Sequence, residues 1–231
     1  MKFVFTNDPG TIGKPHLPER KYLPEGAEAV IADFLPEGDN EEFYRKLADA
    51  DAVLNSYVYL GKKEIDSMQK CKCISFQSTG YNEVDLDYAA QKGIPVTSIL
   101  DYCTQETAEN AIAMMLCLQR STLGYNKLIQ EDHVWNVKAI LHQQRVEGQV
   151  MGIVGLDMLE SEFPDAEYLA RSPLVGRSDV ILNPHSGYQS DTSLELIYKI
   201  SMENAIKCIE GRYEDCWVIR NGVGIGGKYI R

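Results

Sequence analysis

The sequence predicts an α/β protein organised around a five-stranded parallel β-sheet. In the first hundred residues, short β-rich runs alternate with helical stretches, which is typical of a parallel sheet wrapped by helices. The chain has 231 residues, of which 44% are hydrophobic, so it is long enough and apolar enough to bury a substantial core. No internal repeat interrupts the alternation.

The five predicted strands are short runs of β-branched and aromatic residues. They cover residues 2–6, 27–34, 51–56, 73–77 and 94–99. Helices are predicted between the later strands, at residues 41–50, 62–70 and 86–92, and Gly93 is expected to stop the last of them. Five strands joined by four crossovers predict a compact flavodoxin-like unit.

The next part of the chain contains the clearest helical pattern. Residues 104–120 carry Ala108, Ile112, Met115 and Leu116 at helical spacing and are rich in Ala, Met and Leu. The pattern weakens over residues 123–149, which we interpret as an arm or a long loop.

Further strands and one more helix are predicted downstream. Two strand-like runs, residues 149–155 and 156–160, meet without a turn signal and should form one continuous strand. A short strand is predicted at residues 180–183, and a helix follows at residues 192–210. Gly211 is expected to close that helix.

Composition excludes several classes of function. The chain has 34 acidic against 23 basic residues, a net charge of −11, which would repel a phosphate backbone, so nucleic-acid binding is not expected. No stretch approaches the ~18 apolar residues of a membrane helix, and no leader-like segment opens the chain. We therefore expect a cytoplasmic protein without a membrane partner.

The cysteines do not predict a metal site. The six cysteines are scattered without a paired CxxC spacing, which disfavours zinc. Buried free thiols are the expected state, and redox or metal chemistry is the alternative.

The first half of the chain contains three notable motifs: Ser78-Thr79-Gly80-Tyr81-Asn82-Glu83-Val84-Asp85, Gly93-Ile94-Pro95-Val96, and Asp101-Tyr102-Cys103-Thr104 followed by Ala108-Glu109. Together they resemble the substrate domain of D-isomer-specific 2-hydroxyacid dehydrogenases, nearest to their glycerate and C-terminal-binding-protein-like branch. The resemblance implies a hydride transfer between NAD(H) and a small 2-hydroxy or 2-keto acid.

A second group of motifs resembles the two strands that carry the family's catalytic glutamate and histidine. These motifs are Leu156-Asp157-Met158-Leu159-Glu160-Ser161-Glu162 and Val180-Ile181-Leu182-Asn183-Pro184-His185. The resemblance implies that His185 acts as the acid/base and that Glu162 orients its imidazole. A histidine after a strand is, without this context, more often structural or exposed than catalytic.

The sequence departs from the family where the cofactor should bind. Residues 149–155, with Gly152 and Gly155, resemble the first strand of a Rossmann domain, but Gly155 is followed by Leu156 instead of the further glycines that open the pyrophosphate helix. Judged by the resemblance, roughly a hundred residues are absent, about the size of a domain core. The acidic residue for the ribose and the family's catalytic arginine would be lost with them.

Residues 1–103 are therefore interpreted as the flavodoxin-like substrate domain, 104–210 as a remnant of the Rossmann domain, and 211–231 as a C-terminal return and tail. The family uses NAD(H), but we expect this chain to bind no cofactor. A glycine-rich stretch near the end, Gly222 to Gly227, has glycines at spacings similar to the dinucleotide-binding fingerprint, but too few residues follow it to form the helix that the fingerprint requires. An engineered and a natural deletion are both consistent with the sequence.

The substrate site is predicted at the carboxyl ends of the third and fourth strands, where open parallel sheets bind ligands. Backbone N–H groups of Ser78, Thr79 and Gly80 could receive a substrate carboxylate, and Asn55 and Ser56 follow the neighbouring strand. The alternative is that Thr79 and Gly80 only make a tight turn.

Three functional hypotheses remain open at this point. The first is an inactive substrate-side domain of a dehydrogenase that binds its acid weakly if at all. The second is an enzyme completed by a second chain, and the third is a natural binding or regulatory module derived from the enzyme. By resemblance, residues 104–148 correspond to the family's dimer-forming helix and arm, so a homodimer is expected.

Overall fold

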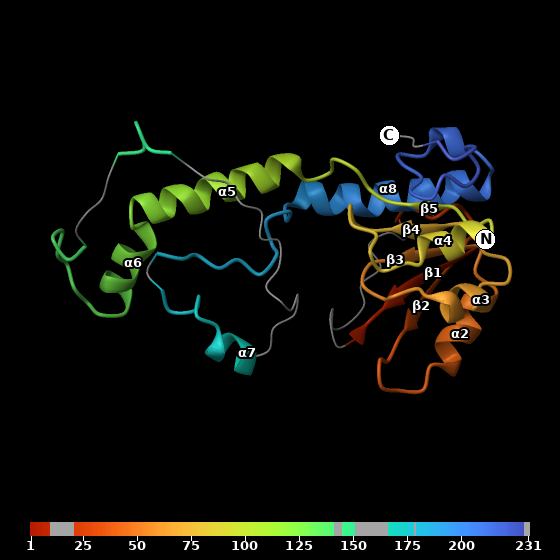
Figure 1. The fold of residues 1–231 in the computed structure, drawn as a ribbon, viewed down its shortest axis with the longest axis horizontal. Coiled ribbons are helices and arrows are strands. Elements are labelled where there is room, and N and C mark those ends of the chain that lie inside the picture. Colours follow the sequence, from red (N-terminus) through yellow and green to blue (C-terminus); the bar gives the residue numbers. More distant parts are fainter. Residues whose placement is uncertain (10–20, 141–144, 151–165, 178, 229–231) are drawn as a thin grey trace. The chain divides into compact units, whose positions relative to one another are not determined.

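The computed structural model describes residues 1–9, 21–140, 145–150, 166–177 and 179–228, drawn in Figure 1. The chain divides into two compact units. The first combines Met1–Tyr102 with Asp191–Arg231, and the second is Cys103–Ser190. The sequence-based division grouped residues 191–210 with the second unit, whereas the structure groups them with the first because their helix buries its apolar side against the sheet.

The first unit is built on a five-stranded parallel sheet in the order β2-β1-β3-β4-β5. The strands are β1 Lys2–Asn7, β2 Glu28–Asp33, β3 Ala52–Asn55, β4 Ile74–Phe76 and β5 Val96–Thr97. Every pair is parallel, with Lys2 opposite Glu28 and Phe3 opposite Ala52. The predicted α/β class and the five-stranded parallel sheet are confirmed, and the order is that of flavodoxin-like folds.

Alternating side chains along the inner strands feed two separate cores. Val4 of β1 and Val53 of β3 belong to one hydrophobic cluster, whereas Phe3 and Leu54 belong to the other. Both faces are covered, so these strands are continuous apolar runs instead of alternating polar and apolar residues.

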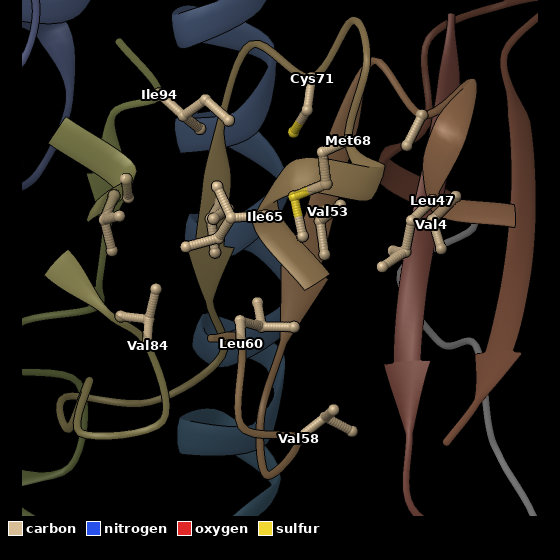
Figure 2. Close-up of a cluster of buried hydrophobic side chains, with 14 of the residues drawn as sticks. Val4, Leu47, Val53, Val58, Leu60, Ile65, Met68, Cys71, Val84 and Ile94 are labelled. Carbon is tan, nitrogen blue, oxygen red and sulfur yellow. The ribbon is translucent and has the colours of Figure 1, made fainter. Parts of the chain in front are cut away.

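Three helices cover the first face: α2 Glu41–Ala48, α3 Lys62–Ser67 and α4 Leu86–Gln91. Figure 2 shows Leu47 of α2 and Ile65 of α3 pointing toward the side chains of the strands, among them Val4 and Val53. Leu47 and Ile65 are buried, which anchors both helices on the sheet.

Local signals set both ends of α4. The Asp85 carboxylate accepts a hydrogen bond from the backbone N–H of Tyr88 at 2.9 Å, which caps the helix N-terminus. Gly93 adopts a φ of +71°, and the N–H of Ile94 donates to the carbonyl of Ala89. Gly93 therefore stops the helix, as predicted.

One long helix, α8 Asp191–Ile209, covers the second face of the sheet together with the tail. Met202, Ala205 and Cys208 of α8 are buried against Phe3 and Leu54. Gly211 ends α8 with a φ of +74°, as predicted.

The tail then returns to the edge strand of the sheet. It passes through the 3₁₀ turn η2 Tyr213–Asp215, and Ile219 pairs in antiparallel fashion with Thr97 of β5.

The second unit contains α5 Thr104–Gln119, α6 Thr122–Gln130 and α7 Ala166–Arg171. The helix predicted at residues 104–120 is confirmed by α5. Helix α6 lies where we predicted an arm or a loop, because Thr122, Gly124 and Asn126 weaken the helical pattern in the sequence.

The strand predicted at residues 180–183 is wrong, since these residues have no strand conformation. A strand needs a partner to receive its backbone hydrogen bonds, and the described residues offer this segment none. The continuous strand predicted at 149–160 lies outside the described residues beyond Val150. None of the described helices combines the length and apolar content required to cross a bilayer.

Candidate functional site

The candidate site lies at the carboxyl ends of β3 and β4. The N–H of Gln77 donates to the carbonyl of Asn55 at 2.9 Å, so the two strands end side by side. The hydroxyl of Ser56 then donates to the Gln77 side-chain oxygen at 3.0 Å. These bonds bring the two predicted substrate segments, 55–56 and 78–80, to the same edge of the sheet, where open α/β folds bind ligands.

Asn55 is placed as a structural residue of this edge. Its side chain is fully buried, and its oxygen accepts a hydrogen bond from the Thr6 hydroxyl. Its amide nitrogen donates to the carbonyl of Val58 at 3.0 Å. Both ends of the amide are therefore used inside the protein, and Asn55 shapes the loop after β3 without presenting its side chain to a bound acid.

The loop Ser78–Thr79–Gly80 is a hydrogen-bonded turn that leaves space on its outer side. The Ser78 hydroxyl donates to the carbonyl of Gly80 at 2.8 Å, and the Ser78 carbonyl accepts from the N–H of Ile99 at 3.0 Å. Thr79 and Gly80 are exposed. A Cβ atom added at Gly80 would meet nothing within 4 Å, so a small ligand could approach the backbone there.

A cation from the tail lies beside this loop. The Nε of Arg220 donates to the hydroxyl of Ser98 at 2.6 Å, and its Nη2 donates to the carbonyl of Thr79 at 3.5 Å. The guanidinium carbon lies 4.6 Å from the centre of the Tyr81 ring. Burial lowers the pKa of Arg220, with an opposing effect from Tyr81, yet an arginine stays charged at neutral pH.

Sequence reasoning missed Arg220. Its partners Ser98 and Thr79 lie 122 and 141 residues away along the chain, and no motif marks it. Only the packing of the tail on β5 places it at the site.

A separate open cleft of about 410 Å³ begins next to the loop. It is lined by Tyr59, Tyr81, Asn82, Val84, Asp85, Leu86 and Asp87. Two carboxylates in this lining make it a poor site for an organic acid. None of the five predicted substrate-binding residues lines it, so the acid is better placed at the 78–80 loop.

His185 belongs to the second unit, where the segment after residue 183 runs along α5. The side-chain oxygen of Asn183 accepts from both the N–H and the hydroxyl of Ser186, at 2.8 and 2.6 Å. The Asn183 amide donates to Asn110 of α5 at 3.5 Å, and the Ser190 hydroxyl donates to the Glu106 carboxylate at 2.6 Å. This last bond lowers the pKa of Glu106.

Within this turn, His185 has an unusual backbone. Its φ is +52°, a left-handed conformation that is uncommon for residues other than glycine, and its side chain is exposed. The ring lies edge-on to that of Tyr188, with the centroids 6.1 Å apart. Such strained positions are enriched at functional sites, which is compatible with the predicted acid/base role.

Three predicted residues lie outside the described part of the chain: Glu162, the partner assigned to His185, and the glycines Gly152 and Gly155.

The glycine-rich tail does not fit a dinucleotide. In the glycine-rich tail, a Cβ at Gly222 would lie 2.6 Å from the Cα of Gly227, and one at Gly224 would lie 2.6 Å from the Tyr213 ring. These glycines are explained by contacts within the chain, and no helix follows them in the described residues.

The described residues also contain no group of three His, Cys, Asp or Glu side chains that could hold a metal ion. All six cysteines are free thiols.

Comparison with known proteins identifies the family. The family described as D-isomer specific 2-hydroxyacid dehydrogenase, catalytic domain, matches residues 11–217, most of the chain. The chain belongs to this family. The predicted family is thereby confirmed, and this family uses NAD(H) and 2-keto or 2-hydroxy acids.

Curated relatives match over part of their length. A hydroxypyruvate reductase of Blautia hydrogenotrophica is 27% identical over 136 residues, which cover 55% of this chain and 41% of the relative. A glyoxylate reductase of Thermofilum pendens is 30% identical over 146 residues, covering 60% of this chain and 42% of the relative. The chain spans about two fifths of the length of these relatives.

Solved structures agree on the fold. A protein of Thermus thermophilus superposes with a TM-score of 0.66 and 16% identity, covering 91% of this chain and 97% of that one. D-Lactate dehydrogenase of Aquifex aeolicus, solved with NAD and lactic acid, gives a TM-score of 0.64 and 15% identity, covering 99% and 98%. At these identities the likeness supports the fold alone.

Proposed function

We propose that this chain is the substrate-side, catalytic part of an NAD-dependent D-2-hydroxyacid dehydrogenase and that it does not turn over by itself. Its ligand would be a small 2-hydroxy or 2-keto acid, held at the carboxyl end of β4. The observation that carries the proposal is that Thr79 and Gly80 are exposed at this edge of the sheet, with open space beside Gly80, in a chain of this family.

The proposed chemistry divides among the chain's own residues. Backbone N–H groups of the 78–80 loop would bind the substrate carboxylate. His185 would take the hydroxyl proton or return it, with Glu162 orienting its imidazole. NAD(H) would supply hydride exchange in the family's reaction. Because Gly155 is followed by Leu156 instead of the further glycines of the fingerprint, we propose that a deletion at this point removed the nucleotide site, and we derive no turnover for this chain.

The absence of turnover is tested by mixing the purified chain with NADH and either glyoxylate or pyruvate and following the near-ultraviolet absorbance of NADH. We expect no oxidation above the enzyme-free control. Clear oxidation by the chain alone would refute the inactivity. Oxidation only after a second NAD-binding chain is added would support the alternative in which the enzyme is completed by a partner.

The acid site is tested by substitutions in the loop. Gly80→Val places carbon in the open space beside the backbone and should weaken glyoxylate binding at least about tenfold, without unfolding the chain. Thr79→Val is the matched control because it alters only an exposed side chain and keeps the backbone N–H groups. Equal glyoxylate affinity in Gly80→Val and the wild type would place the acid elsewhere.

We also propose that the chain forms a homodimer through its second unit. Large apolar side chains are exposed there, among them Ile112 of α5 at 51%, Trp135 at 88% and Val137 at 81%. Exposed apolar surface of this kind commonly marks an interface. Light scattering at micromolar concentration should give twice the monomer mass, and a monomeric mass would contradict the proposal.

We propose, from the scattered cysteines of the sequence, that the protein works in the cytoplasm, where cysteine thiols are kept reduced.

A further inference from the structure

We infer that Arg220, from the C-terminal tail, supplies the cation that binds the carboxylate of the acid at the 78–80 loop. This inference rests on the proposed function and deepens it. It assigns a binding role to a residue on a different segment from those that the motifs indicate.

The tail is fixed to the sheet close to Arg220. The backbone N–H of Arg220 donates to the carbonyl of Val96 at 2.7 Å, next to the bridge between Ile219 and Thr97. The following residue, Asn221, donates from its amide to the carbonyl of Ile94 at 2.8 Å and accepts from the N–H of Val96 at 3.2 Å. The backbone that carries the guanidinium is therefore held in place before any ligand binds.

The side chain is then directed to the carboxyl edge of β4 and β5. Ser98, which is fully buried, accepts from Nε at 2.6 Å, and the ring of Tyr81 supports the face of the guanidinium. Together these contacts fix the plane of the guanidinium beside the loop. A fixed planar guanidinium is well suited to a carboxylate, because its N–H groups match the two oxygens.

The contact between Nη2 and the Thr79 carbonyl places the charge at the substrate loop. At 3.5 Å it is at the long limit for a hydrogen bond. A carboxylate approaching the open side of Gly80 would gain a shorter, charge-assisted bond in its place. The loop and Arg220 would then bind the same ligand group, the loop through backbone N–H donors and Arg220 through its charge.

The charge of the whole chain makes a local cation favourable for binding an acid. A net charge of −11 creates a field that repels small organic acids. A partly buried guanidinium counteracts this field at short range, where solvent screens it least. The backbone donors of the loop carry no net charge and cannot do so alone.

A purely structural role, in which Arg220 only anchors the tail to β5, makes different predictions. An arginine with this role alone affects the stability of the fold but not the preference for a charged ligand over an uncharged one. The discriminating property is therefore the difference in affinity between a carboxylate and its uncharged analogue.

The test uses pyruvate, uncharged pyruvamide and oxalate as probes. Calorimetry measures their affinities, and nuclear magnetic resonance of the backbone amides shows where they bind. Arg220→Met keeps the length of the side chain and removes its charge. We expect it to weaken pyruvate and oxalate at least about tenfold and to leave pyruvamide within about twofold. Arg212→Met is the matched control, since Arg212 lies on the same tail but pairs with Glu210 and Asp215 at the surface. It should leave all three affinities unchanged.

A measurement on the wild type keeps the inference testable if Arg220→Met does not fold. Pyruvate should shift the Nε–Hε resonance of Arg220 together with the amide resonances of Thr79 and Gly80. Loop shifts without a shift at Arg220 would overturn the inference.

The outcomes separate the inference from the proposed function. Pyruvate binding that is unaffected by Arg220→Met overturns the inference and leaves the proposed function standing. Oxalate binding that depends on Arg220, without binding of pyruvate or glyoxylate, supports the cation site and contradicts the proposed substrate class. If neither oxalate nor pyruvate binds the wild type, both are wrong.

Discussion

Asn204 joins three segments of the first unit, and its truncation should measure how firmly the tail is held. The side chain is fully buried on α8. Its oxygen accepts from the backbone N–H of Trp217 at 3.0 Å, and its nitrogen donates to the carbonyl of Ser98 at 3.4 Å. Asn204→Ala leaves this N–H and this carbonyl without a partner and removes buried volume.

The expected cost follows from these contacts. A buried group that loses its partner costs about 1–3 kcal/mol, and the longer bond to Ser98 should contribute near the lower end of that range. We therefore expect Asn204→Ala to lower the free energy of unfolding by about 2–3 kcal/mol. For a protein of this size, this corresponds to a fall of roughly 5–10 °C in the melting temperature.

The assay is thermal and urea unfolding followed by circular dichroism, with Lys199→Ala as control. Lys199 lies on the same helix, its side chain is 51% exposed, and its substitution should change stability by less than about 0.5 kcal/mol. If Asn204→Ala is as stable as Lys199→Ala, the tail is not anchored through Asn204. The positioning of Arg220 would then need another explanation.

Three further predictions follow from the core, the thiols and the surface charges. Leu47→Ala should lower the free energy of unfolding, measured by urea titration, by about 2–5 kcal/mol, because Leu47 is fully buried between α2 and the sheet. A decrease below about 1 kcal/mol, as expected for a half-exposed side chain, would contradict this packing. Burial raises the pKa of the Cys71 thiol to about 12, so iodoacetamide should label the half-buried Cys117 in the native protein much faster than Cys71, as read by mass spectrometry, and equal rates would argue against this burial. Hydrogen bonds from Lys92 and Tyr88 lower the pKa of Asp66 below its usual 3.8. The contribution of Asp66 to stability is therefore fully present above pH 3.8 and is lost as the pH falls through the lower pKa of the folded state. Asp66→Asn should remove this part of the pH dependence of the free energy of unfolding, and identical pH profiles for Asp66→Asn and the wild type would show that the pairing contributes nothing.

The sheet could be predicted from the sequence because its signals are local. Each strand is a short apolar run, and Gly93 and Gly211 mark helix ends through a conformation that favours glycine. The exposed turn at 78–80 could be placed for the same reason, since it directly follows a buried strand.

What could not be predicted depends on contacts that are distant in sequence. Nothing near residue 220 indicates that its side chain reaches Ser98 and Thr79, and nothing near Asn55 shows that both ends of its amide are used internally. The 180–183 run has the residue types of a strand, yet strand formation requires a partner strand. The sequence pattern of α8 predicts an apolar face but does not show which unit this face packs against, so its grouping with the first unit could not be predicted.

We propose that this chain holds the acid-binding half of a dehydrogenase without a nucleotide-binding half. Two calorimetric titrations of the same wild-type sample, one with glyoxylate and one with NADH, test both parts of this proposal. Saturable heat with glyoxylate and none with NADH is the predicted result. Saturable binding of NADH, or no binding of glyoxylate, would contradict it.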